Sequence, residues 1–165
     1  MVEFTCFQSP IGPLSILSLK ERVVKITFEN ESCEKMEKWC KSHLYMGIIE
    51  GTDVIFPVKD QIINYLKGRR KSLDFPVVHI NSPFRKKVLE TERKIPYGQI
   101  RSYGEVARMI NEPRASRAVG SANAEKPLPL YFPCHRIICS DGNLGGFGGG
   151  LKVKRFLLDL ESRYY

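Results

Sequence analysis

The 165-residue chain changes its pattern about half way along. Residues 2–28 form short apolar and alternating runs separated by turn residues, which is typical of antiparallel strands. From residue 82 onward, apolar residues recur at helical spacing instead. The polar, basic stretch RRKSLDFPV, residues 69–77, lies between the two patterns. We therefore expect an α+β fold of two domains, residues 1–78 and 79–165.

The N-terminal domain is predicted to hold a small antiparallel sheet followed by helices. The runs VEFTCF, LSILSL and RVVKITF supply the strands. Ser32 is the expected N-cap of a first helix, and a second, PVKDQIINYLKG, ends at Gly68. FPVVHI, residues 75–80, indicates a further short strand. The inner face of the first helix is expected to be Cys33, Met36, Cys40 and Leu44.

The basic residues gather in the second half of the chain. Residues 81–165 hold 15 Lys and Arg against 8 Asp and Glu, whereas residues 1–80 hold 11 against 10. Such a surplus favours polyanionic partners, of which nucleic acid is the commonest. A charged surface that only keeps the protein soluble is the alternative.

The cysteines and the apolar runs bear on location and on metal binding. Five cysteines at irregular spacing do not form the disulfide framework of a small secreted domain. No apolar run approaches the length of a membrane span, and the N-terminus carries no signal-peptide pattern. We expect a cytoplasmic protein without a membrane partner. Cys33, Cys40 and His43 are better explained as one helix face than as a metal site, so no metal is predicted.

Residues 102–124 predict two short helices separated by the turn NEP. Ser102 and Glu105 form a capping box, and Pro113 is expected to open the second helix. The geometry is that of a helix-turn-helix, with Arg114 and Arg117 able to reach DNA. An ordinary helical hairpin in a core would give the same pattern. The inner face of the first helix is expected to be Val106, Ala107 and Ile110.

The stretch PCHRII places Cys134 beside His135 and Arg136. A neighbouring base or cation raises the fraction of reactive thiolate, although a cysteine that only fills a core is the alternative. The glycine-rich GGFGGG, residues 145–150, suits close approach of backbone to a flat ligand, and a flexible linker is its alternative. Glu161, in the final helix, could orient the histidine. The buried stripe of that helix is predicted to be Val153, Phe156, Leu157 and Leu160.

The C-terminal part of the chain resembles the O6-alkylguanine-DNA alkyltransferases, also called methylated-DNA-protein-cysteine methyltransferases. The motifs IPYGQIRSYGEVA, RAVGSAN, KPLPLYFPCHRII and GGLKVKRFLLDLE stand in the order found in that family and span roughly residues 82–161. The N-terminal half agrees more loosely, mainly in SPIG near the start. The resemblance implies an α+β fold with a C-terminal, mostly helical domain that carries a helix-turn-helix and the P-C-H-R segment.

The resemblance implies DNA repair by a reaction that occurs once per molecule. Cys134 would take an alkyl group from O6 of guanine, and from O4 of thymine, after the damaged base is flipped out of the duplex. His135 would act through a water as the base and Glu161 would orient it. Tyr103 would donate towards the flipped base. The resemblance implies no cofactor, and we expect a monomer.

The resemblance also assigns the DNA contacts and the base pocket. Arg117 would enter the base stack from a helix-turn-helix placed in the minor groove of double-stranded DNA. Residues implied to contact DNA are Ser102, Arg114, Arg117, Ala118 and Arg136. Arg136 is also implied to hold the site together by hydrogen bonds. Residues implied to form the guanine pocket are Pro129, Ile137, Phe147, Gly148 and Gly149.

Two positions depart from the family pattern. Lys126 stands where asparagine is usual, and Gly148 stands where a serine is frequent. Two other functions stay open: a binding module that recognises the lesion without transfer, and a thiol hydrolase or redox sensor that uses Cys134 with Cys139. Members of the binding-module group replace the cysteine, so Cys134 argues against the first.

Overall fold

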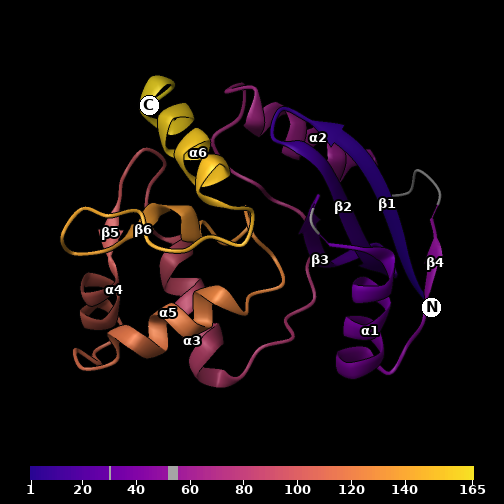
Figure 1. Cartoon of the computed structure of the whole chain (residues 1–165), viewed down its shortest axis with the longest axis horizontal. Helices are drawn as coiled ribbons and strands as arrows, with labels where there is room; N and C mark the ends of the chain where they lie inside the picture. The colour runs from indigo at the N-terminus through magenta and orange to yellow at the C-terminus, as the bar shows by residue number, and fades with distance from the viewer. Residues whose placement is uncertain (30, 52–55) are drawn as a thin grey trace. The chain divides into compact units, whose positions relative to one another are not determined.

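The computed structural model describes residues 1–29, 31–51 and 56–165, and the chain divides into two units (Figure 1). Unit 1 is Met1–Ile80 and unit 2 is Asn81–Tyr165. Most of the described strands and most of the sheet pairing lie in unit 1, whereas unit 2 is mostly helical. The fold is therefore α+β, as predicted.

Unit 1 is built on a sheet whose described strands have the order β3-β2-β1-β4. β1 (Val2–Ser9) pairs antiparallel with β2 (Gly12–Leu19), which pairs antiparallel with β3 (Arg22–Phe28). These three strands confirm the predicted sheet. β4 (Ile48–Glu50) pairs parallel with β1, and the sequence did not indicate it.

Both helices predicted for unit 1 are present, and the second ends two residues earlier than predicted, at Leu66 instead of Gly68. α1 (Cys33–Leu44) begins after Ser32, whose side chain accepts a hydrogen bond from the backbone of Lys35. α2 (Phe56–Leu66) is followed by Gly68 at a φ of 71°. Cys33 is exposed, so the inner face of α1 is shorter than predicted. The buried cluster that α1 forms with the sheet contains Val2, Leu17, Val24, Met36 and Cys40.

The segment FPVVHI does not form a strand of its own. Val77 makes a single parallel bridge to Val23 at the edge of β3. The backbone N–H of Val23 donates to Pro76 at 2.9 Å, and that of Val78 donates back to Val23 at 2.9 Å. Proline has no N–H to donate, which keeps this segment to a bridge at the sheet edge.

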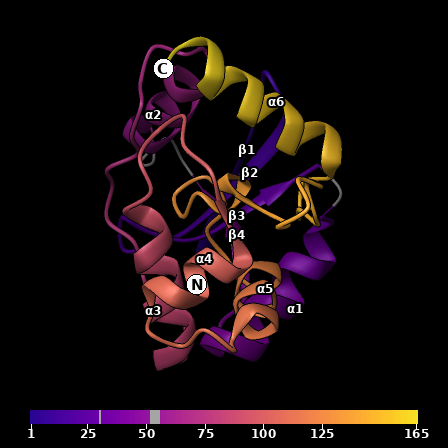
Figure 2. The ribbon, with the colours of Figure 1, turned by 90° about the vertical axis from the view of Figure 1, so that its left-hand side faces the viewer.

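Unit 2 gathers three helices around one core and places a fourth at its other end (Figures 1 and 2). The helices, with their bounds, are α3 (Pro83–Arg93), α4 (Tyr103–Met109), α5 (Ser116–Ala124) and α6 (Leu151–Arg163). The strands β5 (Arg101–Ser102) and β6 (Ile137–Ile138) pair in parallel, and the 3-10 turn η2 (Cys134–Arg136) leads into β6.

Local sequence chemistry sets the starts of α3 and α4. Ser82 caps α3 through the backbone N–H of Arg85, with Pro83 in the first turn. Ser102 and Glu105 form the predicted capping box, which satisfies two backbone N–H groups that the helix leaves free. The core that these helices share contains Val88, Ile95, Val106, Ala107, Ile110, Val119, Ala122 and Ile137.

The start of α5 differs from the prediction. The helix begins at Ser116, and Pro113 and Arg114 lie in the turn before it. The backbone N–H of Ala115 donates to Glu112 at 2.9 Å, which closes a four-residue turn with proline at its second position. Proline suits that position as well as it suits a first helical turn, so the residue type alone did not separate the two.

None of the described helices combines the length and the apolar character needed to cross a membrane.

Candidate active site

Cys134 lies at the start of a single 3-10 turn. Pro133 precedes the turn, and its carbonyl accepts a hydrogen bond from the backbone of Arg136 at 3.0 Å. In a 3-10 turn, successive side chains point about 120° apart. Cys134 can therefore face a cavity while His135 and Arg136 face another element. All three side chains are buried.

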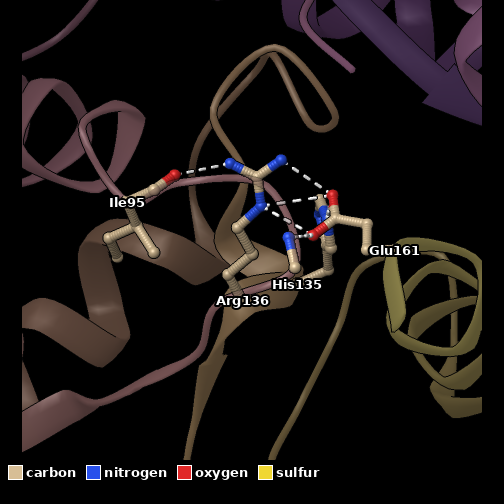
Figure 3. Close-up of polar contacts among 5 residues, drawn as sticks. Ile95, His135, Arg136 and Glu161 are labelled. Atoms are coloured by element: carbon tan, nitrogen blue, oxygen red, sulfur yellow. Dashed lines mark hydrogen bonds and ion pairs between the residues drawn. The ribbon is translucent and has the colours of Figure 1, made fainter. Parts of the chain in front are cut away.

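Glu161 of α6 holds His135 and Arg136 together (Figure 3). His135 Nε2 lies 2.8 Å from Glu161 Oε1. The guanidinium of Arg136 donates to both carboxylate oxygens at 2.8 Å, and to the carbonyl of Ile95 at 2.7 Å. The backbone N–H of Gly98 adds a hydrogen bond to Oε2 at 3.1 Å. The network ties the turn to α6 and to the segment after α3.

The network fixes the charges of its members. Burial acts to raise the pKa of Glu161, but the hydrogen bonds from His135 and Arg136 outweigh burial and hold that pKa well below its usual range. Burial lowers the pKa of His135 against the attraction of Glu161. A neutral His135 that donates its Nε2 proton to an ionised Glu161 keeps Nδ1 as a proton acceptor. The arrangement is that of a base and its orienting carboxylate.

A cavity of about 370 Å³ opens beside the cysteine. Four of the residues predicted for the site line it, and they are Tyr103, Cys134, Phe147 and Gly148. Five further residues complete the lining, and they are Gly120, Asn123, Ala124, Lys126 and Gly146. The reactive sulfur, the tyrosine and the glycine-rich loop therefore share one space.

Three residues expected in the base pocket do not line this cavity: Pro129, Ile137 and Gly149. Ile137 is buried in the helical core, and its carbonyl accepts a hydrogen bond from Lys154 at 2.6 Å. Pro129 is buried in a bridge to Phe132.

Tyr103, the first residue of α4, lies beside the glycine-rich loop. A Cβ atom at Gly145 would come within 3.2 Å of the Tyr103 hydroxyl and 3.3 Å of Cys139 Sγ, and Gly145 has a φ of 71°. Both facts require glycine there. Burial, followed by the nearby Cys139 and Cys134, raises the pKa of Tyr103, so the hydroxyl keeps its proton.

Cys134 favours its neutral form. Burial raises the pKa of the thiol, while the charge and a side-chain hydrogen bond of Lys126 act to lower it. Glu92 raises the pKa further and Lys154 lowers it. A buried thiol of this kind needs a proton acceptor before it can attack.

Two family models match the chain. The model of the DNA binding domain of 6-O-methylguanine DNA methyltransferase covers residues 83–163, and that of its ribonuclease-like domain covers residues 2–78. The chain belongs to the 6-O-methylguanine DNA methyltransferase family.

Relatives and solved structures agree along nearly the whole chain. The methylated-DNA–protein-cysteine methyltransferase of Methanosarcina acetivorans is 35% identical over 96% of this chain and 97% of its own. That of Haemophilus influenzae is 37% identical over 98% of this chain and 87% of its own. The crystal structure of Mycobacterium tuberculosis OGT in complex with DNA superposes with a TM-score of 0.85 at 32% identity, and covers 99% of this chain and 94% of the other.

The structure places the residues that were predicted to contact DNA in three different settings. Arg114, Arg117 and Ala118 are exposed at the turn and on the first half of α5. Ser102 is the N-cap of α4, with its hydroxyl accepting from Glu105. Arg136 is buried and bonded to Glu161 and Ile95, which contradicts the expectation that it contacts DNA. Its place supports the role of holding the site together.

Lys154 is a site residue that the sequence reasoning missed. The side chain is buried, and its ammonium donates to the carbonyls of Ile137, Leu144 and Gly146. It ties the glycine-rich loop to the strand that follows the cysteine. Phe156, predicted to be buried, is partly exposed, so the inner face of α6 is turned towards Lys154. The spacing of Lys154 from Leu157 and Glu161 is helical and carried the signal.

Proposed function

We propose that this protein repairs DNA by transferring an alkyl group from O6 of guanine to the sulfur of Cys134, once per molecule. One observation carries the proposal: in a chain of this family, a buried cysteine lines a cavity beside a histidine that is held by an ionised carboxylate. The same displacement extends to O4 of thymine. We further propose that unit 2 carries both DNA binding and transfer, which agrees with the residues matched by the DNA binding domain model.

The damaged base must leave the duplex to reach Cys134. The sulfur is buried at the wall of a cavity, and an alkylated O6 inside the stack is out of reach of an in-line attack. Arg117 is exposed on α5 and long enough to fill the space that an extruded nucleotide leaves. The helix-turn-helix would enter the minor groove, which suits recognition of damage in any sequence. The basic surplus of residues 81–165 supports the phosphate contacts.

The transfer is a single displacement. The thiol proton passes to His135 through a water, and Glu161 stabilises the resulting imidazolium. The sulfur electron pair forms the S–C bond while the C–O6 bond breaks and its pair returns to the guanine. The hydroxyl of Tyr103 donates towards a ring nitrogen, which makes the base a better leaving group. The guanine ends with one more proton, and Cys134 ends as a thioether.

The same chemistry accounts for the single turnover and for the absence of any cofactor requirement. A thioether has no ready leaving group, so the acceptor is not regenerated. The alkyl group comes from the substrate and the acceptor from the protein. We also propose that the protein is a monomer and that it acts in the cytoplasm. The five free thiols support the second of these.

Mass spectrometry of the peptide that carries Cys134 tests the proposal. After incubation with a duplex that contains O6-methylguanine, we expect a gain of one methyl group on Cys134. Cys134→Ala should bind the duplex and transfer nothing, and Cys139→Ala, a matched control at the second thiol of this region, should still accept the methyl group. No gain with tight binding would favour a module that only recognises the lesion. A reversible disulfide between the two cysteines would favour a redox sensor.

The base-flipping role of Arg117 has its own comparison. Arg117→Ala should slow transfer from the duplex much more than transfer from free O6-benzylguanine, because only the duplex requires extrusion of a base. Arg114→Ala removes the same charge from the turn and is the control. Equal losses on both substrates would contradict the proposed role of Arg117.

A further inference from the structure

Lys126 occupies the wall of the cavity beside Cys134, immediately after α5. Its ammonium donates to the backbone carbonyl of Asn123 at 2.8 Å and lies 5.7 Å from the ring centroid of Phe147. The side chain is half-buried. The ammonium therefore has a partner on two sides, and its side chain lines the same cavity as the reactive sulfur.

Several charged or titratable groups around Cys134 interact with it electrostatically. Glu92 comes from α3, Tyr103 from α4, Lys126 from the segment after α5 and Lys154 from α6, while His135 is its chain neighbour in η2 and is bonded to Glu161. Lys126 exerts the strongest effect in favour of the thiolate, through its charge and a side-chain hydrogen bond. Lys154 acts more weakly on the sulfur, and backbone carbonyls hold its ammonium.

We propose that Lys126 is a further catalytic residue for the transfer, and that its ammonium group stabilises the thiolate of Cys134 until the bond to carbon forms. The proposal rests on the alkyl transfer proposed above. The thiol proton still leaves through His135, and Lys126 keeps its own proton throughout. Its charge offsets the burial of the sulfur anion, which is the largest effect opposing ionisation.

The charge of Lys126 acts in a setting that Asn123 and Glu92 hold in place. The amide of Asn123 donates to Glu92 at 2.7 Å, and its backbone carbonyl accepts from Lys126. A neutral asparagine at position 126 would bring no charge to the sulfur. The positive charge of the lysine is therefore the property that a substitution can test.

The pH dependence of Cys134 alkylation by iodoacetamide tests this role without DNA. The sulfur forms a bond to the methylene carbon, the C–I bond breaks, and iodide leaves with its electron pair. The rate is followed on the Cys134 peptide by mass spectrometry. The rate rises with pH as the thiol ionises, and the midpoint of this rise reports the pKa of Cys134. Lys126→Asn and Lys126→Met should each move the midpoint to higher pH by about one to three units, because a nearby opposite charge shifts a pKa by that amount. The rate near neutral pH should fall at least about tenfold.

Two further variants separate charge from structure. Lys126→Arg keeps the positive charge and should keep the midpoint within a few tenths of a unit. Lys152→Asn removes one positive charge from an exposed position of α6 and should leave the midpoint unchanged. An unshifted midpoint in a folded Lys126→Asn protein, checked by thermal unfolding, would overturn the proposal, and so would a Lys126→Arg variant that behaves like Lys126→Met. Because no DNA is present, these outcomes are independent of whether the protein transfers alkyl groups from DNA.

Discussion

Two carboxylates of unit 2 are both almost fully buried but differ in their hydrogen-bond partners. Glu92 of α3 and Glu161 of α6 are 0% and 1% exposed. Glu161 accepts hydrogen bonds from His135, from the guanidinium of Arg136 and from the backbone of Gly98. Glu92 accepts a hydrogen bond from the Asn123 amide at Oε1, and among the described residues its Oε2 has no hydrogen-bond partner. Glu161 is therefore a carboxylate with several hydrogen-bond donors, whereas Glu92 has one in the described part of the chain.

The pKa values follow the partners rather than the burial. Burial raises the pKa of Glu92 from 4.5 to about 7, and the Asn123 hydrogen bond offsets only part of the effect. At Glu161 the bonds from His135 and Arg136 outweigh the burial and lower the pKa. Two buried carboxylates are thus a permanent anion in one place and an acid that titrates near neutrality in the other. The permanent anion belongs to the site where His135 must be oriented.

Removal of the paired anion should have the largest effect on stability. Glu161→Ala leaves the buried guanidinium of Arg136 without an anion, with the Ile95 carbonyl as its remaining hydrogen-bond acceptor among the described residues, and should lower the free energy of unfolding by about 3–5 kcal/mol. Urea denaturation near pH 7 measures the loss. Asp159→Ala, at an exposed position of the same helix, is the control and should change little.

A double variant shows whether the loss arises from the unpaired cation. Glu161→Ala combined with Arg136→Met should recover part of the stability, because no buried charge then remains without its partner. If the double variant loses the sum of the two single losses, Glu161 and Arg136 do not stabilise each other and the comparison fails.

Glu92 should make the stability of the protein depend on pH in the opposite sense to Glu161. The folded-state pKa of Glu92 lies above its unfolded value, so the folded protein binds more protons between about pH 4.5 and pH 7. Stability from this group is full below that window and falls by about 3 kcal/mol as the pH rises through it. Glu161 has a lowered folded-state pKa, so its contribution is present at neutral pH and is lost as the pH falls below about 4.5.

Glu92→Gln isolates this effect. The amide keeps the acceptor for Asn123 and supplies a donor for Asn123 Oδ1, which has no partner within the described residues. The variant should be more stable than the wild type at pH 8 and nearly equal to it at pH 4.5. The free energy of unfolding of each protein is measured by urea denaturation at each pH, and the two curves are subtracted. The difference removes the contribution of His135, whose neutral state also makes stability depend on pH. Parallel profiles would mean that Glu92 is ionised at little cost.

The comparison also shows what the sequence could and could not predict. Local chemistry was readable: Ser32, Ser82 and the Ser102–Glu105 box begin helices where the structure has them. Each cap involves residues at most three apart, so a short window contains all of its partners. The P-C-H-R segment was readable because its residue types carry chemistry and match a family.

Contacts between distant segments were not readable. Arg136 reaches the carbonyl of Ile95 across 41 residues, and a solvated or DNA-contacting arginine has the same local sequence. Glu92 could have been found, because it follows Val88 and Leu89 at helical spacing and so lies on their buried face. That pattern does not contain Asn123, the hydrogen-bond partner 31 residues away that offsets part of the effect of burial on the pKa of Glu92.

The smallest expected effect concerns the backbone that supports Glu161. Gly98 has a φ of 78°, donates its N–H to Glu161, and a Cβ atom there would overlap the ring of Tyr165. Gly98→Ala should lower the free energy of unfolding by about 1–2 kcal/mol through the left-handed conformation alone. Tyr165 is largely exposed and can move, so the overlap should add little.

Gly142→Ala separates backbone strain from support of the carboxylate. Gly142 has a φ of 89°, and a Cβ atom there would meet none of the described residues within 4 Å. The loss of unfolding free energy in Gly142→Ala therefore measures backbone strain alone. Any larger loss in Gly98→Ala reports the weakened hydrogen bond to Glu161. The excess should disappear when the two glycine substitutions are repeated in the Glu161→Ala protein, because the acceptor is then absent. An excess that persists without the carboxylate would assign it to Tyr165, and the backbone of Gly98 would then contribute nothing to the stability of the ionised Glu161.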